Sequence, residues 1–447
     1  MQERPVTVVG GGLAGCEAAW ALAERGHEVL LVEMRPGTCT PAHQTELLAE
    51  LVCTNSFKSE DPLNAHGELK KEMGELGSLL LPCADGSRVA AGAALAVDRR
   101  LFAEAMTRSI AGHPGIRLVR EESREIPPGP AVIATGPLTS DALSTAIREL
   151  LGDRGLAFYD AIAPIVSRES IDERIVFAAG RYDQEADYLN CPLSRKEYLR
   201  FIEELRSADP YPGHDWEAIP YFEGCLPIEV MAERGPDTLR FGPLKPVGLR
   251  DPRTGRRPHA VVQLRREDRA GQMWNLVGFQ TRLRHGEQKR VFRRIPGLDR
   301  AEFLRYGGIH RNSYLNFPER LLPYGAPPER PDLIFAGQLT GVEGYVESAA
   351  SGILAGINLA RLLEGERPVL PPTTTMLGGL FRYLREASPQ GFQPMNSNWG
   401  LVDPVVVRAR GRRERRALLA ARAEEAFRSW VEAEGVAPAI PAPGARE

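Results

Sequence analysis

Cysteine is scarce in this chain of 447 residues, and its spacing argues against the common cysteine-based sites. The six cysteines are widely scattered and none belongs to a CxxC pair, the spacing that zinc sites and thiol–disulfide centres generally use. We therefore expect no metal site and no disulfide-stapled secreted scaffold. Lysine is also scarce, at 6 residues against 50 arginines, which we attribute to a GC-rich genome.

Long apolar runs are missing as well. No uninterrupted apolar run approaches the roughly 18 residues that suggest a membrane span. The motif VTVVGGGLAG begins at Val6, which leaves no room for a signal peptide before it. We therefore expect a soluble, cytoplasmic protein with no membrane partner. The length and an apolar content of 43% are sufficient for two to three domains.

The first 33 residues have the pattern of a dinucleotide-binding unit. The sequence predicts a short strand, a glycine turn, an alanine-rich helix that ends near Gly26, and a second strand that ends at Glu33. In such a G-x-G-x-x-G unit the glycines allow a tight turn, an approach to pyrophosphate and close helix packing, and the acid accepts from a ribose hydroxyl. We favour this interpretation over a plain glycine turn because every part is in place. The predicted cofactor-binding residues here are Gly10, Gly11, Gly12, Leu13, Ala14, Gly15 and Glu33.

A second glycine-rich element lies at Leu333–Leu363, where a strand, a Gly/Thr loop and a helix of small residues follow one another. In flavoproteins with two dinucleotide-binding motifs such an element closes the flavin site, although tight helix packing alone is the alternative. Gly337, Gln338 and Gly341 are the cofactor-binding candidates. The segment PAVIATGPLTS (130–140) predicts another strand of the same sheet.

The predicted fold is therefore α/β, with a Rossmann-like FAD-binding domain that is split in sequence by an inserted α/β domain. We place its first part at 1–184, the insertion at 185–324, its second part at 325–435 and a flexible tail at 436–447.

The inserted segment is strongly basic. Residues 239–294 hold 15 Lys/Arg and 4 Asp/Glu, an excess of +11, with aromatic and amide residues among them, including Trp274, Phe279 and His285. Arginine binds phosphates and aromatic faces stack on bases, so we favour RNA or an anionic cofactor over a plain solvated face. The RNA-binding candidates are Arg282, Arg284, Lys289 and Arg290, with Arg408–Arg416 as an extension. His310 and Arg311 fit either a ligand contact or ordinary loop residues.

Two cysteines lie in polar, glycine- or proline-containing surroundings. Cys53 occurs in LVCTNSFKS and Cys225 in EGCLPIEV. Positive charge and donor groups favour a reactive thiolate. The alternative interpretation is an ordinary cysteine buried in the core, without a chemical role. Cys53 and Cys225 lie far apart in the sequence and lack the short spacing of a redox pair. Two separate thiols that act on one substrate are therefore the better interpretation.

Several long blocks resemble one family. The chain is similar, from residue 5 to about residue 403, to the folate- and FAD-dependent tRNA (uracil-5-)-methyltransferases, and more distantly to the flavoprotein glucose-inhibited division protein A, which usually has a longer C-terminal helical region. The blocks are VVGGGLAGCEAAWALAERG, LVCTNSFKS, YDQEADYLNCP, EGCLPIEVMAERGPDTLRFGPLKPVGL, WNLVGFQTRLRHGEQKRVF, RYGGIHRNSYLN, FAGQLTGVEGYVESAASGILAGIN and FQPMNSNWGL.

The resemblance implies an activity. Methylenetetrahydrofolate would donate one carbon to uridine at C5, in position 54 of the tRNA T-loop; reduced FAD would supply electrons and NADPH or NADH would regenerate it. Cys53 and Cys225 match the two functional cysteines. The motifs do not say which one attacks, and we expect Cys53 as the nucleophile and Cys225 as the base. Tyr345 and Glu347 would line the flavin.

The same resemblance implies tRNA as the partner and no obligate protein partner. Two alternatives remain open from the sequence. One is a related flavoprotein that modifies the tRNA wobble uridine together with a GTPase, and the other is a flavin-containing protein that binds or folds RNA.

Overall fold

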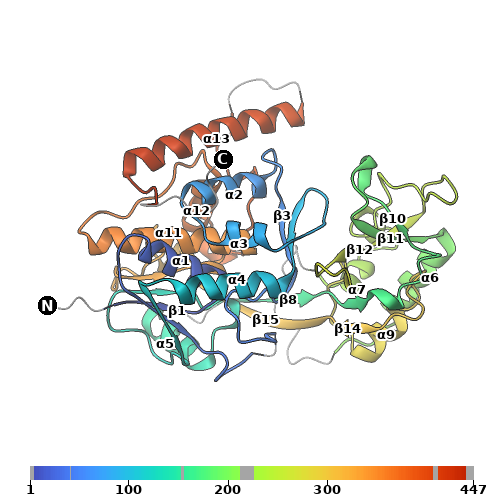
Figure 1. Ribbon diagram of the computed structural model, residues 1–447, viewed down its shortest axis with the longest axis horizontal. Helices are drawn as coiled ribbons and strands as arrows, with labels where there is room; N and C mark the ends of the chain where they lie inside the picture. Colours follow the sequence, from blue (N-terminus) through green and yellow to red (C-terminus); the bar gives the residue numbers. More distant parts are fainter. Residues whose placement is uncertain (1–4, 41, 153–155, 212–225, 406–410, 439–447) are drawn as a thin grey trace.

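The computed structural model describes residues 5–40, 42–152, 156–211, 226–405 and 411–438 (Figure 1). These residues form two modules. The cofactor module contains the N-terminal and C-terminal parts of the described chain, and the inserted module, green to yellow in Figure 1, lies beside it. Cys225 and the end of the predicted tail fall outside the described residues.

A five-stranded parallel sheet lies at the centre of the cofactor module. Its order is β16-β7-β1-β2-β6. β1 pairs with β2 on one side and with β7 on the other, and β16, which comes late in the chain, pairs with β7 at the edge. This confirms the predicted α/β fold with a split Rossmann-like domain. The strands are β1 (Val6–Val9), β2 (Val29–Glu33), β6 (Ile116–Arg120), β7 (Ala131–Ile133) and β16 (Leu333–Phe335).

Two helices from opposite parts of the sequence cross in close contact beside this sheet. They are α1 (Leu13–Ala23) and α11 (Tyr345–Leu363). A Cβ atom added to Gly352 would lie 2.1 Å from the Ala14 carbonyl oxygen, and one added to Gly356 would lie 2.6 Å from that of Ala18. α11 is long and apolar enough to cross a membrane, but 78% of that stretch is buried inside the protein, so it is a core helix here.

The predicted first helix was nearly right. α1 ends at Ala23 and not near Gly26, because the backbone turns after Glu24 and Gly26 takes a positive φ of 86° before β2.

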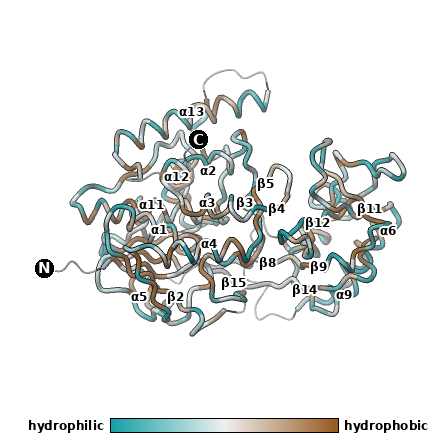
Figure 2. Tube along the Cα trace, viewed as in Figure 1, coloured by the Kyte–Doolittle hydropathy of each residue, from teal (hydrophilic) through white to brown (hydrophobic). Residues whose placement is uncertain are grey.

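Smaller elements complete the cofactor module. β3 (Ser56–Ser59), β4 (Arg88–Val89) and β5 (Ala94–Val97) form a three-stranded antiparallel sheet. The helices are α2 (Ala65–Glu75), α3 (Leu80–Gly86), α4 (Arg99–Gly112), α5 (Asp141–Leu151), α10 (Phe317–Arg320), α12 (Met376–Glu386) and α13 (Arg412–Glu434). Figure 2 shows hydrophilic and hydrophobic residues mixed along α13, whose apolar side chains, such as Phe427 and Trp430, are buried.

The inserted module has its own sheet and core. Six antiparallel strands have the order β10-β11-β12-β13-β9-β14, and their apolar faces pack with helices around Phe201, Phe279 and Phe292. The strands are β9 (Ile165–Ser167), β10 (Phe177–Ala178), β11 (Tyr188–Leu193), β12 (Ala260–Arg266), β13 (Met273–Leu276) and β14 (Phe303–Arg305). The helices are α6 (Arg195–Arg206), α7 (Ile228–Glu233), α8 (Thr238–Phe241) and α9 (His285–Phe292).

A separate two-stranded sheet lies between the modules (Figure 1). It pairs β8 (Leu156–Ile162) with β15 (Gly308–Tyr314) in antiparallel register. The sheet of the inserted module begins before residue 185 and ends before residue 324. We therefore propose that the β8–β15 pair marks the module boundary, in place of the boundaries predicted at 184/185 and 324/325.

Candidate functional site

The three fingerprint glycines occupy positions with different steric demands. Gly10 follows β1 with φ of 103°, and a Cβ atom there would lie 2.6 Å from the Ala134 carbonyl oxygen. A Cβ atom on Gly15 would lie 1.7 Å from the Gly10 carbonyl oxygen. Gly12, by contrast, has open space where its Cβ would be. Gly10 and Gly15 are thus required by packing, and Gly12 keeps a space open in front of α1.

The N-terminus of α1 faces that space without a capping side chain. Gly12 is its N-cap residue, no side chain caps the helix, and its first turn contains no acidic residue. The first turn therefore presents backbone N–H groups and the positive end of the helix dipole, beginning at Leu13 and Ala14. This arrangement suits a pyrophosphate.

Glu33 ends β2 beside the glycine loop. Its carboxylate accepts hydrogen bonds from the Gly11 N–H at 2.8 Å and from the Arg35 Nε at 2.8 Å. Burial works to raise the pKa of the Glu33 carboxyl, but the hydrogen bonds and charge of Arg35 outweigh it and hold this pKa below its usual value. An ionised carboxylate retains lone pairs for a ribose hydroxyl.

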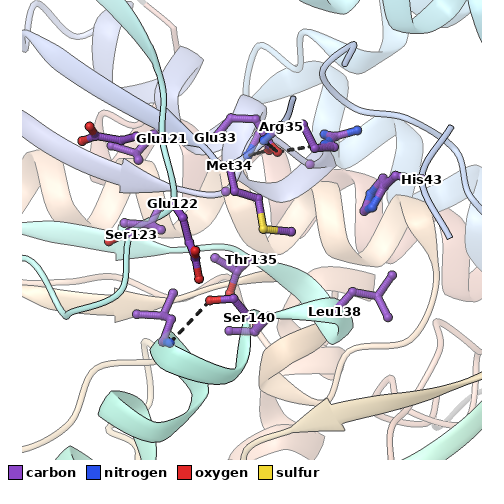
Figure 3. A pocket seen from close by; sticks show the side chains of 17 residues that line it. Glu33, Met34, Arg35, His43, Glu121, Glu122, Ser123, Thr135, Leu138 and Ser140 are labelled. Carbon is purple, nitrogen blue, oxygen red and sulfur yellow. Dashed lines mark hydrogen bonds and ion pairs between the residues drawn. The ribbon is translucent and has the colours of Figure 1, made fainter. Parts of the chain in front are cut away.

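A pocket opens between this carboxylate and the segment after β7. Figure 3 shows Glu33, Met34 and Arg35 along one side of it, with Thr135, Leu138 and Ser140 opposite. Apolar and polar groups thus surround a space next to the glycine loop, as an adenosine moiety requires. The cradle at Gly12, the uncapped helix and Glu33 together fit the pyrophosphate and adenosine of a dinucleotide.

The late glycine-rich element returns to the same loop. Gly337 follows β16, and its N–H donates to the Ser351 Oγ at 2.7 Å. Gln338 donates to the Glu343 carboxylate at 2.6 Å. A Cβ atom on Gly341 would lie 2.6 Å from the Phe392 ring. These contacts hold the predicted residues next to α11, and their contact with a flavin stays a prediction.

Tyr345 and Glu347 in the first turn of α11 have different partners. The Tyr345 hydroxyl oxygen accepts from the backbone N–H groups of Cys53 at 2.7 Å and Thr54 at 3.3 Å. The Glu347 carboxylate accepts from the Ser397 N–H at 2.9 Å and lies 3.4 Å from the His66 Nε2. Glu347 is only 1% exposed. Tyr345 therefore connects the cofactor helix to the Cys53 loop, while Glu347 is held on the other side by Ser397 and His66.

Arginines from both modules hold the carbonyl groups of the Cys53 loop. Arg99, at the start of α4, donates to the Leu51 carbonyl at 2.5 Å and to the Cys53 carbonyl at 3.1 Å. Arg305 of the inserted module donates to the Val52 carbonyl at 2.5 Å. Both guanidinium groups are largely buried, so their positive charge acts on the loop with little screening from water.

A second pair of contacts joins the loop to β12. Arg265 donates to the Thr54 Oγ1 at 2.6 Å, and the Asn55 amide donates to the Arg266 carbonyl at 3.0 Å. Glu267 at the end of this strand accepts from the Arg99 Nε at 2.6 Å and is 1% exposed. A pocket lies beside these residues and is lined from both modules. Cys53 is thus placed where the modules meet.

The sequence did not single out Arg99, Arg265, Glu267 or Arg305. The three arginines lie 46 to 253 positions away in the sequence from the carbonyl or hydroxyl groups to which they donate. Glu267 contributes by pairing with Arg99. No local sequence pattern marks such distant pairs. The excess of arginine in the inserted segment was a signal for Arg265 and Arg305, whereas no feature of the sequence pointed to Arg99 or Glu267.

Cys225 lies outside the described residues, so its position relative to Cys53 stays a prediction. The residues that border its segment are described. The Tyr211 N–H donates to the Arg282 carbonyl at 2.8 Å, and the Ile228 N–H donates to the Gln280 carbonyl at 2.7 Å. One stretch of the inserted module, residues 280–282, therefore anchors both ends of the segment that carries Cys225.

The predicted RNA-binding residues follow this stretch. Arg284 and Lys289 are exposed. Arg290 is exposed too, but pairs with Glu204 at 2.5 Å and with Glu287 at 2.7 Å. Arg282 is half-buried and lies 3.8 Å from the Glu229 carboxylate. Their contact with RNA stays a prediction, and the side chains of His310 and Arg311 are not among those described.

The chain shows clear similarity to known proteins. The family described as Glucose inhibited division protein A matches residues 5–367. A protein of Thermus thermophilus named methylenetetrahydrofolate–tRNA-(uracil-5-)-methyltransferase TrmFO is 55% identical over 440 residues, which cover 98% of this chain and 99% of that protein. The protein of the same name from Rubrobacter xylanophilus is 58% identical over 415 residues, or 91% of this chain and 92% of that protein.

Solved structures share the fold as well. The structure of Aquifex aeolicus GidA matches with a TM-score of 0.70 and 17% sequence identity, covering 95% of this chain and 73% of that chain. At this identity the likeness concerns the fold alone, and it extends over both modules.

Proposed function

Because the chain belongs to the Glucose inhibited division protein A family and, within it, to the TrmFO tRNA methyltransferases, we infer that it transfers the carbon of methylenetetrahydrofolate to C5 of a uracil in tRNA. The chain is therefore an enzyme, a tRNA (uracil-5-)-methyltransferase. The structural observation that carries this function is the Cys53 loop, which Tyr345 of the cofactor helix and Arg305 of the inserted module hold at its backbone.

FAD is the cofactor that we propose for the glycine loop. The N–H groups at the start of α1 would bind its pyrophosphate, Glu33 would accept from a ribose hydroxyl, and the open space at Gly12 would admit both. When bound, FAD supplies the reducing equivalents for the transferred carbon, and we propose NADPH or NADH as their source. We propose that Tyr345 and Glu347, in the first turn of α11, line the flavin ring.

The chemistry of uracil explains why thiols are needed. C5 of uracil is a weak nucleophile until a thiolate adds to C6 and makes it enolate-like, and a base must later remove the C5 proton. We propose Cys53 for the addition and Cys225 for the proton removal. The buried charges of Arg99 and Arg305 beside the Cys53 loop support this choice, because positive charge stabilises a thiolate.

We further propose the uridine at position 54 of the T-loop as the target, with the exposed basic residues of the inserted module as the tRNA surface. A base in a structured loop is reachable only after it leaves its stack. A cytoplasmic location and activity without an obligate protein partner follow from the same proposal.

The test is incorporation of label from methylenetetrahydrofolate into undermodified tRNA in the presence of FAD and NADPH, followed by digestion to nucleosides. Label in 5-methyluridine at position 54 is expected. Label-free tRNA, together with modification that needs a GTPase, would instead identify the related wobble-uridine enzyme. Cys53→Ala and Cys225→Ala are each expected to lose transfer, and a protein that kept full transfer without both thiols would contradict the covalent route.

The order of the two thiols has its own test. A tRNA with 5-fluorouridine at position 54 should trap the attacking thiol, since fluorine cannot leave as a proton does. Under our proposal Cys225→Ala still forms the trapped complex and Cys53→Ala does not. The opposite pattern would exchange the two roles.

A further inference from the structure

The aromatic residues that seemed available for base stacking are mostly in the core. Trp274 is 4% exposed and Phe279 is 0% exposed, and both belong to the core of the inserted module. Of the three aromatic residues named from the sequence, only His285 is exposed. Of these three rings, His285 is therefore the one that can face RNA.

His285 is the outer member of a stack of three rings. Its centroid lies 4.4 Å from that of Tyr306, with 11° between the planes. Tyr306 lies 5.3 Å from Phe303, again with 11° between the planes. Phe303 in turn contacts the core residue Phe292, at 6.5 Å. The stack thus runs from the core to the surface, where α9 and β14 lie side by side (Figure 1).

This geometry leaves one face of the His285 ring available. One face of the ring packs on Tyr306, and His285 is nevertheless exposed. A ring that is supported from behind by two parallel rings loses little conformational freedom when a further planar group stacks on it. The supported His285 ring is therefore a preformed surface on which a base could stack.

Two cations close to His285 in the sequence have no ion-pair partner among the residues that the structure describes. Arg284 directly precedes His285, and Lys289 follows it by four residues, which places it on the same side of α9. Both are exposed, and neither forms a salt bridge with any residue that the structure describes. Arg290, on the same helix, already pairs with Glu204 and Glu287. Arg284 Nε donates to the Pro210 carbonyl at 3.4 Å, which does not neutralise its charge. The positive charge near the ring stack that no described carboxylate balances is thus located at Arg284 and Lys289.

We propose that the ring stack of His285, Tyr306 and Phe303 is a platform for one unpaired base of the tRNA, and that Arg284 and Lys289 bind the phosphates on either side of that base. The proposal rests on the tRNA methyltransferase function and names a surface for its substrate. Removing the target uridine from its stack leaves a neighbouring base without a partner, and the platform replaces that lost stacking. Stacking on a ring does not select among bases.

The test measures the dissociation constant of a T-arm RNA at fixed salt. His285→Ala is expected to weaken binding roughly 5- to 100-fold, the range that loss of one base–aromatic stack produces. His285→Phe keeps a planar ring and is expected to stay within about twofold of the wild type. Phe241→Ala is the matched control, because it removes another exposed ring of the same module, one that is 74% exposed.

The phosphate contacts proposed for Arg284 and Lys289 are tested separately, by the salt dependence of binding. Lys289→Ala is expected to lower the slope of log Kd against log salt by about one, since it removes one phosphate contact. Equal binding by the wild type and His285→Ala would overturn the platform, as would equal losses in His285→Ala and His285→Phe. A wild type that binds the T-arm but transfers no label would overturn the proposed function instead, while the binding comparison would still decide on the platform.

Discussion

The hydroxyl oxygen of Tyr345 accepts a hydrogen bond of 2.7 Å from the backbone N–H of Cys53, which lies 292 residues earlier in the chain. Burial raises the pKa of this hydroxyl well above its usual value, so it stays protonated at any pH the protein meets. It therefore acts as a fixed neutral acceptor, and it ties the start of the cofactor helix to the backbone of one proposed catalytic residue.

Tyr345→Phe tests this tie. The variant keeps the ring, including its contact with Phe57 at a centroid distance of 6.1 Å, and removes only the acceptor of the Cys53 and Thr54 N–H groups. We expect methyl transfer in a single turnover to slow roughly 10- to 100-fold, because a small displacement of a reacting group costs that much. The flavin absorbance of the purified variant should stay normal. Transfer at the wild-type rate would mean that the arginines alone position the loop.

The glycines of the fingerprint make a matched pair of substitutions. Gly12→Ala adds a methyl group to open space, so the fold should keep its melting temperature while FAD affinity falls, because the methyl group occupies the cradle. Gly15→Ala forces a Cβ to 1.7 Å from a carbonyl oxygen, so the protein itself should be destabilised. Titration with FAD and thermal unfolding distinguish the two. Unchanged FAD affinity in Gly12→Ala would place the pyrophosphate elsewhere.

The buried ion pair between Arg99 and Glu267 joins the two modules at 2.6 Å. Glu267→Gln leaves the guanidinium without its counter-charge, and loss of one partner in a buried pair costs about 3–5 kcal/mol. We expect a clear fall in melting temperature and slower methyl transfer, since Arg99 also holds the Cys53 loop. Glu104→Gln, which breaks the exposed pair with Arg100 on α4, serves as the control and should change neither value. Equal effects would show that the pair is unimportant.

Glu68 predicts a pH dependence of stability. It is 0% exposed, and neither of its carboxyl oxygens has a hydrogen-bond partner among the described residues. Burial raises its pKa to about 7; Lys71 opposes this shift, and Glu424 and Glu75 add to it. The folded state therefore keeps a proton that the unfolded chain releases near its ordinary pKa of 4.5.

The sign follows from proton linkage. Because the folded state holds this proton more tightly than the unfolded chain, the contribution of Glu68 to stability is greatest below about pH 4.5 and falls as the pH rises toward 7. Glu68→Gln cannot ionise, so the variant should equal the wild type near pH 4.5 and exceed it by roughly 1–3 kcal/mol above pH 7. Apparent unfolding free energies of both proteins across this range test it. A constant difference between them would exclude Glu68 as the titrating group.

Much of the fold could be predicted because its constraints are local. The spacing of Gly10, Gly12 and Gly15 and the acid at Glu33 belong to one continuous unit whose geometry each residue type restricts. The later strand at 333–335 was recognisable from its apolar run and the glycine loop after it. The segment before residue 185 was harder to assign, because short strands such as β9 and β10 have too few residues to show a period.

The site could be predicted only in part, for a physical reason. Cys53 was recognisable from its polar neighbours, but the groups that hold it come from distant positions and have no local signature. Trp274 and Phe279 were expected among RNA-facing residues and are buried in the core. An aromatic residue near arginines has the same sequence pattern whether it faces the core or the solvent, and only the packing of β13 and α9 decides which.

The crossing of α1 and α11 has a consequence for synthesis of the protein. Gly352 follows Ala14 by 338 residues, so a ribosome adding roughly 5–20 residues per second needs about 17–70 s to deliver the second helix after the first. All six strands of the inserted sheet emerge within that interval, as one continuous stretch. On the ribosome the inserted module can therefore finish folding first, and the cofactor cradle closes only when the chain is nearly complete.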